Sequence, residues 1–271
     1  MPLLWSDMTG KTMKAIICAR YGPPEVLQFG EVEVPTPKEN AILVKVQGTT
    51  VTAADIRVRG FNVPLWYWLQ ARMYLGLRRP KRAILGAELA GEIESVGSNV
   101  IRFKEGDRVY ASLGHEFGAY AEFRSIPESG IVAPKPSNLT YEEAATIPLG
   151  GLTALHFLRM GGIQSGQKVL VYGASGSVGA YTVQLARFFG ATVTGVCSAS
   201  NADLVRSLGR PRPLITRERT SQEDTSRMTL SLMPWAKFLA CEAGVPSKRT
   251  GGTSRCSLQE SQSRPLRILS C

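Results

Sequence analysis

The spacing of hydrophobic and polar residues divides the chain into a strand-rich first half and a second part in which strands alternate with helices. Short apolar runs punctuated by Pro and Gly fill residues 14–48, and the alternation in 42-ILVKVQ-47 is typical of a half-buried strand. Further short strands are predicted within residues 83–97, 106–113 and 119–126. Short strands between turns favour a compact β-domain that covers about residues 14–135.

Residues 61–82 interrupt these strands with the segment FNVPLWYWLQARMYLGLRRPKR, which is aromatic first and basic afterwards. Two interpretations are open. Trp and Tyr beside Lys and Arg suit a helix that lies on a membrane surface. A partly buried helix, or a lid over a pocket, with its basic end in solvent is the alternative. Pro64 and Pro80 limit the length of any helix here, which favours the alternative.

From Tyr141 onward the pattern becomes helical. Residues 141–162 have helical spacing, with Thr140 as the expected N-cap. A strand (168-KVLVY-172), a glycine loop (173-GASGSVG-179), a helix and a second strand (191-ATVTGVCS-198) follow, which together form one βαβ unit. Residues 201–209 predict the next helix, with Asn201 near its cap and Gly209 at its end.

After Gly209 the periodicity is lost. Residues 210–271 are rich in Arg, Ser and Thr and show neither a strand nor a helix period, so we expect a disordered tail in which 228–243 forms at most a short helix. This segment holds 11 Lys and Arg against 5 Asp and Glu, whereas residues 1–209 hold 21 against 17. The net charge of +10 is therefore scattered, and no nucleic-acid partner is expected.

Composition narrows the class of protein. A chain of 271 residues with 44% hydrophobic and 20% charged residues is ordinary for globular domains, and it has no apolar run long enough to span a bilayer. The first residues lack the pattern of a secretory signal. Five cysteines without a C-x-x-C pair favour a reducing compartment, so we expect a cytoplasmic protein, with an organelle left open. With only two histidines, no bound metal is expected.

The glycine loop carries the main chemical prediction. A loop that follows a buried strand and opens a helix presents unpaired N–H groups and a partial positive charge, which suit the pyrophosphate of a dinucleotide. The alternative is a tight turn without a ligand. We expect the cofactor to contact the following loop residues: Gly173, Ser175, Gly176, Ser177, Val178 and Gly179.

The end of the next strand indicates which dinucleotide is bound. An acidic residue there would accept hydrogen bonds from the ribose 2′-hydroxyl of NAD, but the strand ends 195-GVCSASN-201 without one. Ser198, Ser200 and Asn201 can instead donate hydrogen bonds to a 2′-phosphate. The sequence therefore favours NADP (NADPH) as the cofactor.

These motifs resemble the medium-chain dehydrogenase/reductase superfamily, in its zinc-free quinone oxidoreductase (zeta-crystallin-like) branch. The resemblance is collinear over about 13–209 and rests on the residues 83–111, 142–155, 168–198 and 203–209. It implies an α/β fold in which a GroES-like β-domain (13–138) precedes an incomplete Rossmann domain with a doubly wound parallel sheet (139–209). Residues 210–271 form the aberrant tail.

The resemblance also implies site residues. Zinc-dependent relatives carry a Cys and a Gly-His-Glu at their metal, whereas this chain has 50-TVTAAD-55 and 86-GAE-88, with Ala87 in place of His. Without a metal, hydrogen bonds must polarise the substrate oxygen. Thr52 is the candidate donor with Asp55 near it, although both also suit a helix N-cap. Thr153 matches a position beside the nicotinamide.

The implied reaction is hydride transfer from NADPH to a quinone, an enone or a reactive carbonyl, and the resemblance leaves a homodimer open. Relatives continue past Gly209 with a strand similar to YDVVFDAVG, which is absent here. Residues 227–238 can be encoded by nucleotides whose shifted frame reads YDVVFDAVGKI, so we expect a change of reading frame near Gly209. The alternative function is a catalytically inactive fragment that binds nucleotide or a full-length partner.

Overall fold

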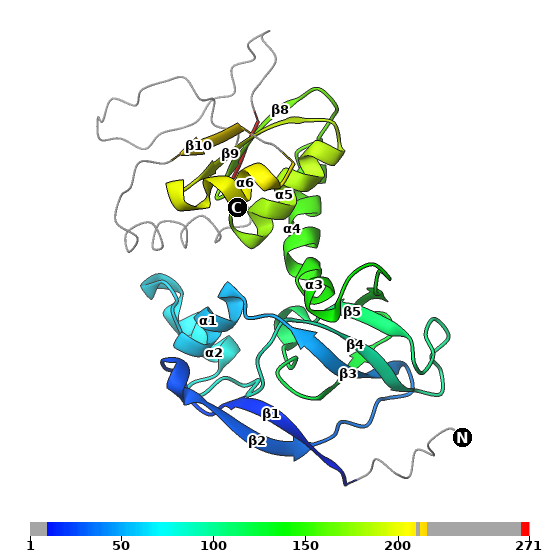
Figure 1. Cartoon of the computed structure of the whole chain (residues 1–271). Helices are drawn as coiled ribbons and strands as arrows, with labels where there is room; N and C mark the ends of the chain where they lie inside the picture. Colours follow the sequence, from blue (N-terminus) through cyan, green and yellow to red (C-terminus); the bar gives the residue numbers. More distant parts are fainter. Residues whose placement is uncertain (1–9, 210–211, 216–266, 271) are drawn as a thin grey trace. The chain divides into compact units, whose positions relative to one another are not determined.

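The structure is a computed structural model that describes residues 10–209, 212–215 and 267–270 (Figure 1). Contacts divide the chain into two compact units, Met1–Leu149 and Gly150–Cys271. The domain limits expected from the sequence, 13–138, 139–209 and 210–271, stay a prediction. The expected fold class, a β-domain of the GroES type followed by a Rossmann-like α/β unit, is confirmed.

The first unit is built on an antiparallel sheet of five strands in the order β6-β3-β4-β5-β7. These strands are β3 (Ala41–Thr49), β4 (Glu88–Val96), β5 (Arg108–Ser112), β6 (Phe123–Pro127) and β7 (Ile131–Pro134). Two further strands, β1 (Thr12–Cys18) and β2 (Leu27–Glu33), pair with each other. Apolar side chains from the five-stranded sheet, including Ile42, Val44, Leu89 and Val109, form its core.

The alternation predicted for residues 42–47 holds only in the second half of β3. The first four residues of the strand are all buried, and exposure alternates after them. Side chains of successive residues point to opposite faces of a sheet, so burial of all four means that both faces of β3 are covered in its first half.

Short helices complete the first unit. They are η2 (Pro24–Val26), α1 (Ala53–Gly60), η3 (Leu65–Tyr67), α2 (Trp68–Leu75), η4 (Gly114–Glu116) and α3 (Tyr141–Ala145), where η marks a 3₁₀ helix. As expected, the helical part of residues 61–82 lies between Pro64 and Pro80.

The helical spacing of residues 141–162 corresponds to two helices, α3 and α4 (Ile147–Met160), which are separated at Thr146. Thr140 caps α3 as expected, because its side chain accepts a hydrogen bond from the Glu143 N–H. The break at Thr146 has a physical cause. Pro148 has no N–H to donate to the carbonyl four residues before it, so it suits the first turn of a new helix better than the interior of a continuous one.

The second unit contains a parallel sheet in the order β10-β9-β8-β11 (Figure 1). Its described elements are β8 (Lys168–Tyr172), α5 (Ser177–Phe188), β9 (Thr192–Cys197), η5 (Ala199–Asn201), α6 (Ala202–Ser207), β10 (Arg212–Ile215) and β11 (Arg267–Ser270). The predicted βαβ unit is thus confirmed as β8-α5-β9. Its core joins the strands to α5 through Val169, Val171, Val183 and Val193.

Two segments after Gly209 form strands, although no regular element was expected there. β10 pairs with β9 and β11 pairs with β8, both in parallel. Each contains a short apolar run, PLI in β10 and IL in β11, that is too brief to stand out in a polar stretch. The other residues of 210–271, including the short helix expected in 228–243, lie outside the described residues.

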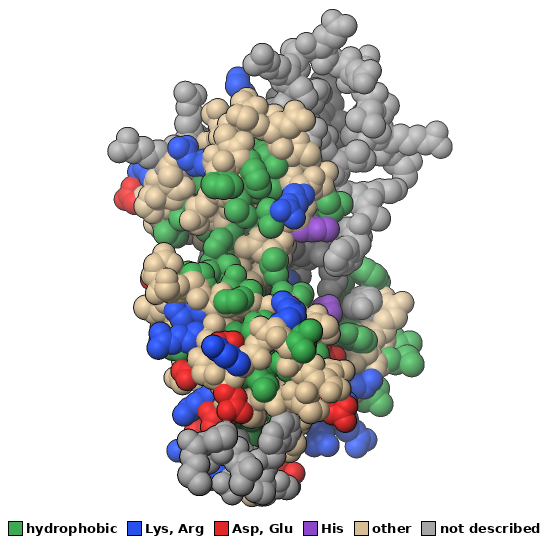
Figure 2. Space-filling view, turned by 90° about the vertical axis from the view of Figure 1, so that its right-hand side faces the viewer, with side chains coloured by type: hydrophobic (Ala, Val, Ile, Leu, Met, Phe, Trp, Pro, Cys, Tyr) green, Lys and Arg blue, Asp and Glu red, His purple; other side chains and the backbone are tan. Residues whose placement is uncertain are grey.

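The surface charge and the hydropathy of the helices concern two kinds of partner, nucleic acid and membrane. On the face in Figure 2, Lys and Arg side chains lie among Asp and Glu side chains and do not form one continuous basic area. The absence of a nucleic-acid partner stays a prediction. Within the described ranges, no helix has the length and apolar character needed to cross a bilayer.

Candidate functional site

The glycine loop joins the end of β8 to the start of α5. Gly173 has a φ of +74°, a conformation that favours glycine, and it turns the chain away from the strand. The N–H groups of Gly173 and Ala174 both donate to the Val196 carbonyl at 3.0 Å, and the Gly176 N–H donates to the Gly173 carbonyl at 2.9 Å. The loop is therefore fixed against β9 before the helix begins.

The three glycines of the loop differ in what the fold requires of them. Gly173 needs its positive φ. Gly179 needs the absence of a side chain, because a Cβ there would lie 2.1 Å from the Gly173 carbonyl oxygen. Gly176 is the least constrained of the three: its φ is −75°, and an added Cβ would lie 3.3 Å from the Gly173 carbonyl oxygen, a tight contact that a shift of a few tenths of an ångström would relieve. A glycine at a helix N-terminus also leaves the room that a closely approaching phosphate needs.

The N-terminus of α5 suits an anion. Gly176 is the N-cap residue, and no side chain of the described residues makes a capping hydrogen bond to this helix. Within this part of the chain the N-cap thus satisfies none of the first N–H groups of the helix, and the first turn carries no acidic residue that would repel a phosphate. The residues fit the pyrophosphate of a dinucleotide, with Ser177 and Val178 supplying N–H groups of the first turn.

A cluster of polar side chains lies at the end of β9. The Ser198 and Ser200 hydroxyl oxygens are 3.0 Å apart. The Asn201 side-chain amide donates to Ser198 Oγ at 3.1 Å and to Ser175 Oγ at 3.3 Å. The structure thus brings Ser175 of the glycine loop together with the three residues expected to hold a 2′-phosphate. Their role in binding stays a prediction.

Thr153 lies on α4, where its side chain is partly buried. One turn earlier, α4 approaches α5 closely, because a Cβ on Gly150 would lie 2.6 Å from Ser177 Oγ and from the Tyr181 ring. Thr153 is therefore on a helix held against the first turns of α5. Its place beside the nicotinamide stays a prediction.

Thr52 and Asp55 lie in the first unit and form the capping box of α1. The Thr52 hydroxyl accepts from the Asp55 N–H at 3.4 Å and donates to Asp55 Oδ2 at 2.6 Å, while the Thr52 N–H donates to the same oxygen at 2.8 Å. The N-cap interpretation is thus confirmed. A threonine hydroxyl has one hydrogen, and here Asp55 receives it, so polarisation of a substrate by Thr52 stays a prediction.

Asp55 also orders the chain around it. Its side chain is only 3% exposed, and Oδ1 accepts from the Gly86 N–H at 2.8 Å, which ties α1 to the segment before β4. The phenol of Tyr120 is held in the same region, where it donates to the Thr50 carbonyl at 3.2 Å. Burial and the neighbouring Asp55 carboxylate raise the pKa of the Tyr120 hydroxyl above its ordinary value, so this phenol stays protonated.

Glu88 is the residue that the sequence analysis missed. It is 3% exposed at the start of β4, and its Oε1 accepts from the Thr50 hydroxyl at 2.6 Å. Its Oε2 accepts from the Leu149 N–H at 2.7 Å. Burial raises the pKa of the Glu88 carboxyl, and these two hydrogen bonds oppose the shift. The available signal was an acidic residue inside the otherwise apolar run 84-ILGAELAG-91.

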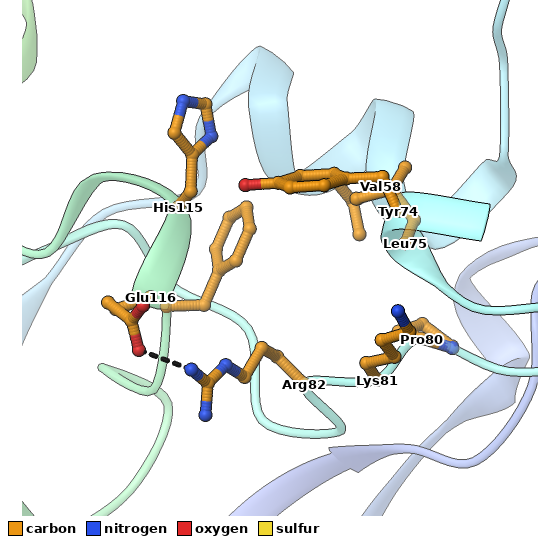
Figure 3. A pocket seen from close by; sticks show the side chains of 9 residues that line it. Val58, Tyr74, Leu75, Pro80, Lys81, Arg82, His115 and Glu116 are labelled. Atoms are coloured by element: carbon orange, nitrogen blue, oxygen red, sulfur yellow. Dashed lines mark hydrogen bonds and ion pairs between the residues drawn. The ribbon is translucent and has the colours of Figure 1, made fainter. Parts of the chain in front are cut away.

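A cavity of about 440 Å³ lies in the first unit, between α2 and η4 (Figure 3). Apolar side chains line part of it, and Tyr74, Lys81, Arg82, His115 and Glu116 line the rest. Arg82 and Glu116, which both line it, form an ion pair, and the Tyr74 and His115 rings meet edge to face. None of the site residues expected from the sequence lines this cavity. Helix α2 does form one wall, as the lid interpretation of 61–82 implies.

Within the described part of the chain, no group of three or more His, Cys, Asp and Glu side chains could hold a metal ion. Ala87, which replaces the histidine of zinc-dependent relatives, is buried beside Glu88. Freedom from zinc stays a prediction.

Comparison with known proteins identifies the family. Residues 38–137 match the profile of the alcohol dehydrogenase GroES-like domain. The chain is 33% identical over 247 residues to the chloroplast envelope quinone oxidoreductase homolog of Arabidopsis thaliana, covering 88% of this chain and 71% of that protein. It is 32% identical over 209 residues to the NADPH-dependent alkenal/one oxidoreductase, chloroplastic, of Arabidopsis thaliana, covering 73% of this chain and 51% of that protein.

A solved structure supports the same family. The quinone oxidoreductase from Coxiella burnetii superposes with a TM-score of 0.66 at 28% identity, over 81% of this chain and 65% of that chain. The names of these proteins imply a nicotinamide cofactor and a small-molecule substrate. The chain therefore belongs to the medium-chain dehydrogenase/reductase superfamily of oxidoreductases, in its quinone oxidoreductase branch.

Proposed function

We propose that this protein is a zinc-free oxidoreductase that uses NADPH to reduce a quinone, an enone or a reactive carbonyl. The observation that carries the proposal is the N-terminus of α5, which begins at Gly176 and where no side chain of the described residues makes a capping hydrogen bond. Family membership supports the reaction class, and the name of one Arabidopsis thaliana relative supports NADPH and an alkenal or enone.

Residues of the second unit would hold the cofactor. The backbone of Gly173, Gly176 and Gly179 leaves room for the pyrophosphate, and the first N–H groups of α5 donate to it. The hydroxyl and amide groups of Ser198, Ser200 and Asn201 donate to the 2′-phosphate, with Ser175 adjoining them. When bound, NADPH supplies the hydride, and with a proton from solvent a quinone becomes a hydroquinone.

Residues of the first unit would act on the substrate. In this proposal Thr52 donates a hydrogen bond to the substrate oxygen, which requires its hydroxyl to turn away from Asp55 Oδ2. Asp55 keeps Thr52 in place through the Thr52 N–H, whose hydrogen bond does not depend on the hydroxyl. No side chain is assigned as general acid, because solvent protonates the product.

A second candidate is a catalytically inactive fragment that binds nucleotide or a full-length partner. One observation favours it: the strand with which relatives continue past Gly209 is not found in the residues that follow here. The chain spans 71%, 51% and 65% of the length of the three proteins compared above, so the activity of those whole proteins comes to it only as a proposal. A homodimer and a cytoplasmic location belong to the main proposal. An organelle stays open, because the names of both Arabidopsis thaliana relatives place those proteins in the chloroplast.

The test is NADPH oxidation by the purified full chain with a soluble quinone and, separately, with an enone. Turnover that depends on the acceptor, and that survives washing with a chelator, supports the main proposal. Binding of NADPH without turnover on any acceptor supports the inactive fragment. A protein that binds no nicotinamide dinucleotide contradicts both candidates.

A further inference from the structure

Helix α2 and the residues beside it expose a group of large apolar side chains. Leu65 and Trp66 come from η3, Leu69 and Met73 lie four residues apart on α2, and Leu77 follows the helix. All five are exposed, Leu65 to 90%, Met73 to 69% and Leu77 to 71%. We call this group the α2 apolar face. Large apolar side chains gathered on one short segment mark an interaction site more often than scattered ones do.

The inner side of the same segment is firmly anchored, so the exposure is built into the fold. Ala71 is buried. The Arg72 guanidinium lies 3.8 Å from the centre of the Phe61 ring and also over the Tyr21 and Trp68 rings. One of its nitrogens donates to the Leu77 carbonyl at 2.6 Å. Leu77 is thereby held at the helix end with its side chain in solvent.

Basic residues follow directly. Gly76, at a φ of +121°, turns the chain out of α2, and the Tyr21 hydroxyl fixes that turn by donating to the Gly76 carbonyl at 2.9 Å. The sequence then reads 78-RRPKR-82. Lys81 and Arg82 are engaged, by the Met73 carbonyl and by Glu116. Arg78 and Arg79 are exposed and have no ion pair with any described acidic residue.

We propose that residues 65–82 dock this protein on the surface of an anionic lipid bilayer. The α2 apolar face enters the boundary between headgroups and acyl chains, and Arg78 and Arg79 meet the anionic headgroups. An exposed tryptophan in the same segment as exposed arginines suits this boundary, because its ring is apolar with a polar edge.

The charge distribution selects this partner over others. A symmetric contact with a second copy would bring two copies of the same unpaired arginines toward each other, which opposes association. A nucleic acid would satisfy the arginines but would leave the α2 apolar face in water. An anionic bilayer satisfies both groups at once. This inference does not depend on the proposed oxidoreductase activity.

The test is co-sedimentation of the full chain with vesicles. One set contains phosphatidylcholine alone, and the other contains about a third phosphatidylserine, a composition with a negative surface potential. We expect binding to the second set only, and we expect it to weaken as salt rises, because the attraction is screened. Leu69→Ser/Met73→Ser and Arg78→Glu/Arg79→Glu are each expected to lower the affinity at least about tenfold.

A matched control keeps the test specific. Ile101→Ser/Lys104→Glu removes one exposed apolar and one exposed basic side chain from the turn between β4 and β5, and its binding is expected to equal that of the wild type. Quenching of tryptophan fluorescence in the wild type by brominated lipid gives a measurement that needs no variant to fold. If the quenching is weaker in the Trp66→Phe variant than in the wild type, the result supports insertion of η3 into the bilayer.

Several outcomes overturn the proposal. The proposal is wrong if the protein does not bind vesicles, or if it binds both vesicle types equally. It is also wrong if the two double variants bind as the wild type does, or if brominated lipid does not quench the tryptophan fluorescence. If the protein does not bind vesicles but associates with itself, and the Leu69→Ser/Met73→Ser variant abolishes this association, the α2 apolar face contacts a second copy of the chain instead.

Discussion

Glu88 Oε2 accepts a hydrogen bond of 2.7 Å from the backbone N–H of Leu149, so a carboxylate on β4 caps the first turn of α4. The other carboxylate oxygen is bound by the Thr50 hydroxyl. A single buried side chain thereby joins the end of β3, the start of β4 and the helix that leads into the second unit.

Loss of this carboxylate is expected to destabilise the protein. Glu88→Ala leaves the Leu149 N–H and the Thr50 hydroxyl without their acceptor, which costs about 1–3 kcal/mol for each buried group left unpaired. Urea unfolding of the variant and the wild type measures the difference. The control is Glu94→Gln, on the same strand but half-exposed, and it should unfold as the wild type does. Equal stability of Glu88→Ala and the wild type would show that the cap contributes nothing.

The pKa of Glu88 also sets a pH dependence. Its folded-state pKa is raised above 4.5, so the folded protein binds a proton at this site more tightly than the unfolded chain does. The stabilisation that Glu88 contributes is therefore complete at pH values below the pKa of its unfolded state. It is lost as the pH rises through the raised pKa of the folded state. We expect the unfolding free energy of the wild type, relative to Glu88→Gln, to decline across that window. A difference that grows with pH would reverse the assigned sign.

The capping box of α1 offers a test of Thr52. Thr52→Ala is expected to cost about 1 kcal/mol of stability, and Thr52→Ser should retain it. The matched control is Thr140→Ala, which removes the equivalent cap of α3. If Thr52 also polarises the substrate, kcat/KM for a quinone falls in Thr52→Ala and stays unchanged in Thr140→Ala. Equal kcat/KM in both variants would limit Thr52 to capping.

Cofactor choice is tested at the end of β9. Ser198→Asp places a carboxylate where a 2′-phosphate is expected, so we predict that NADPH binding weakens roughly tenfold or more while NADH binding is maintained or improved. Fluorescence titration with both dinucleotides measures the ratio. Ser207→Asp, exposed at the end of α6, is the control. An unchanged ratio in Ser198→Asp would remove the polar cluster from the 2′-phosphate site.

The sequence predicted those parts of the fold that local pattern determines. β8, the glycine loop, α5 and β9 follow from an apolar run, glycine spacing and helical periodicity, all within about thirty residues. The role of Glu88 could not be predicted in this way, because its partners lie 38 and 61 positions away in the sequence. The grouping of Ser175 with Asn201 likewise depends on β8 and β9 being neighbours.

At two other places the local sequence carried a signal that was too weak to determine the structure. Pro148 indicated the break between α3 and α4, yet the helical spacing on both sides concealed it. β10 and β11 are only four residues long, and their pairing with β9 and β8 comes from the sheet that receives them and not from their own sequence.

The central claim, that the glycine loop binds NADPH, is tested most directly by titrating NADPH into the wild type and into Gly176→Val. An added Cβ at Gly176 would make a tight contact of 3.3 Å with the Gly173 carbonyl oxygen, so we predict a Kd at least about tenfold higher and a loss of unfolding free energy of about 1 kcal/mol, as expected for an apolar residue at an N-cap. Gly60→Val, at the end of α1, is the control and should bind as the wild type does. An unchanged Kd in Gly176→Val, or a wild type that binds no NADPH, would contradict the claim.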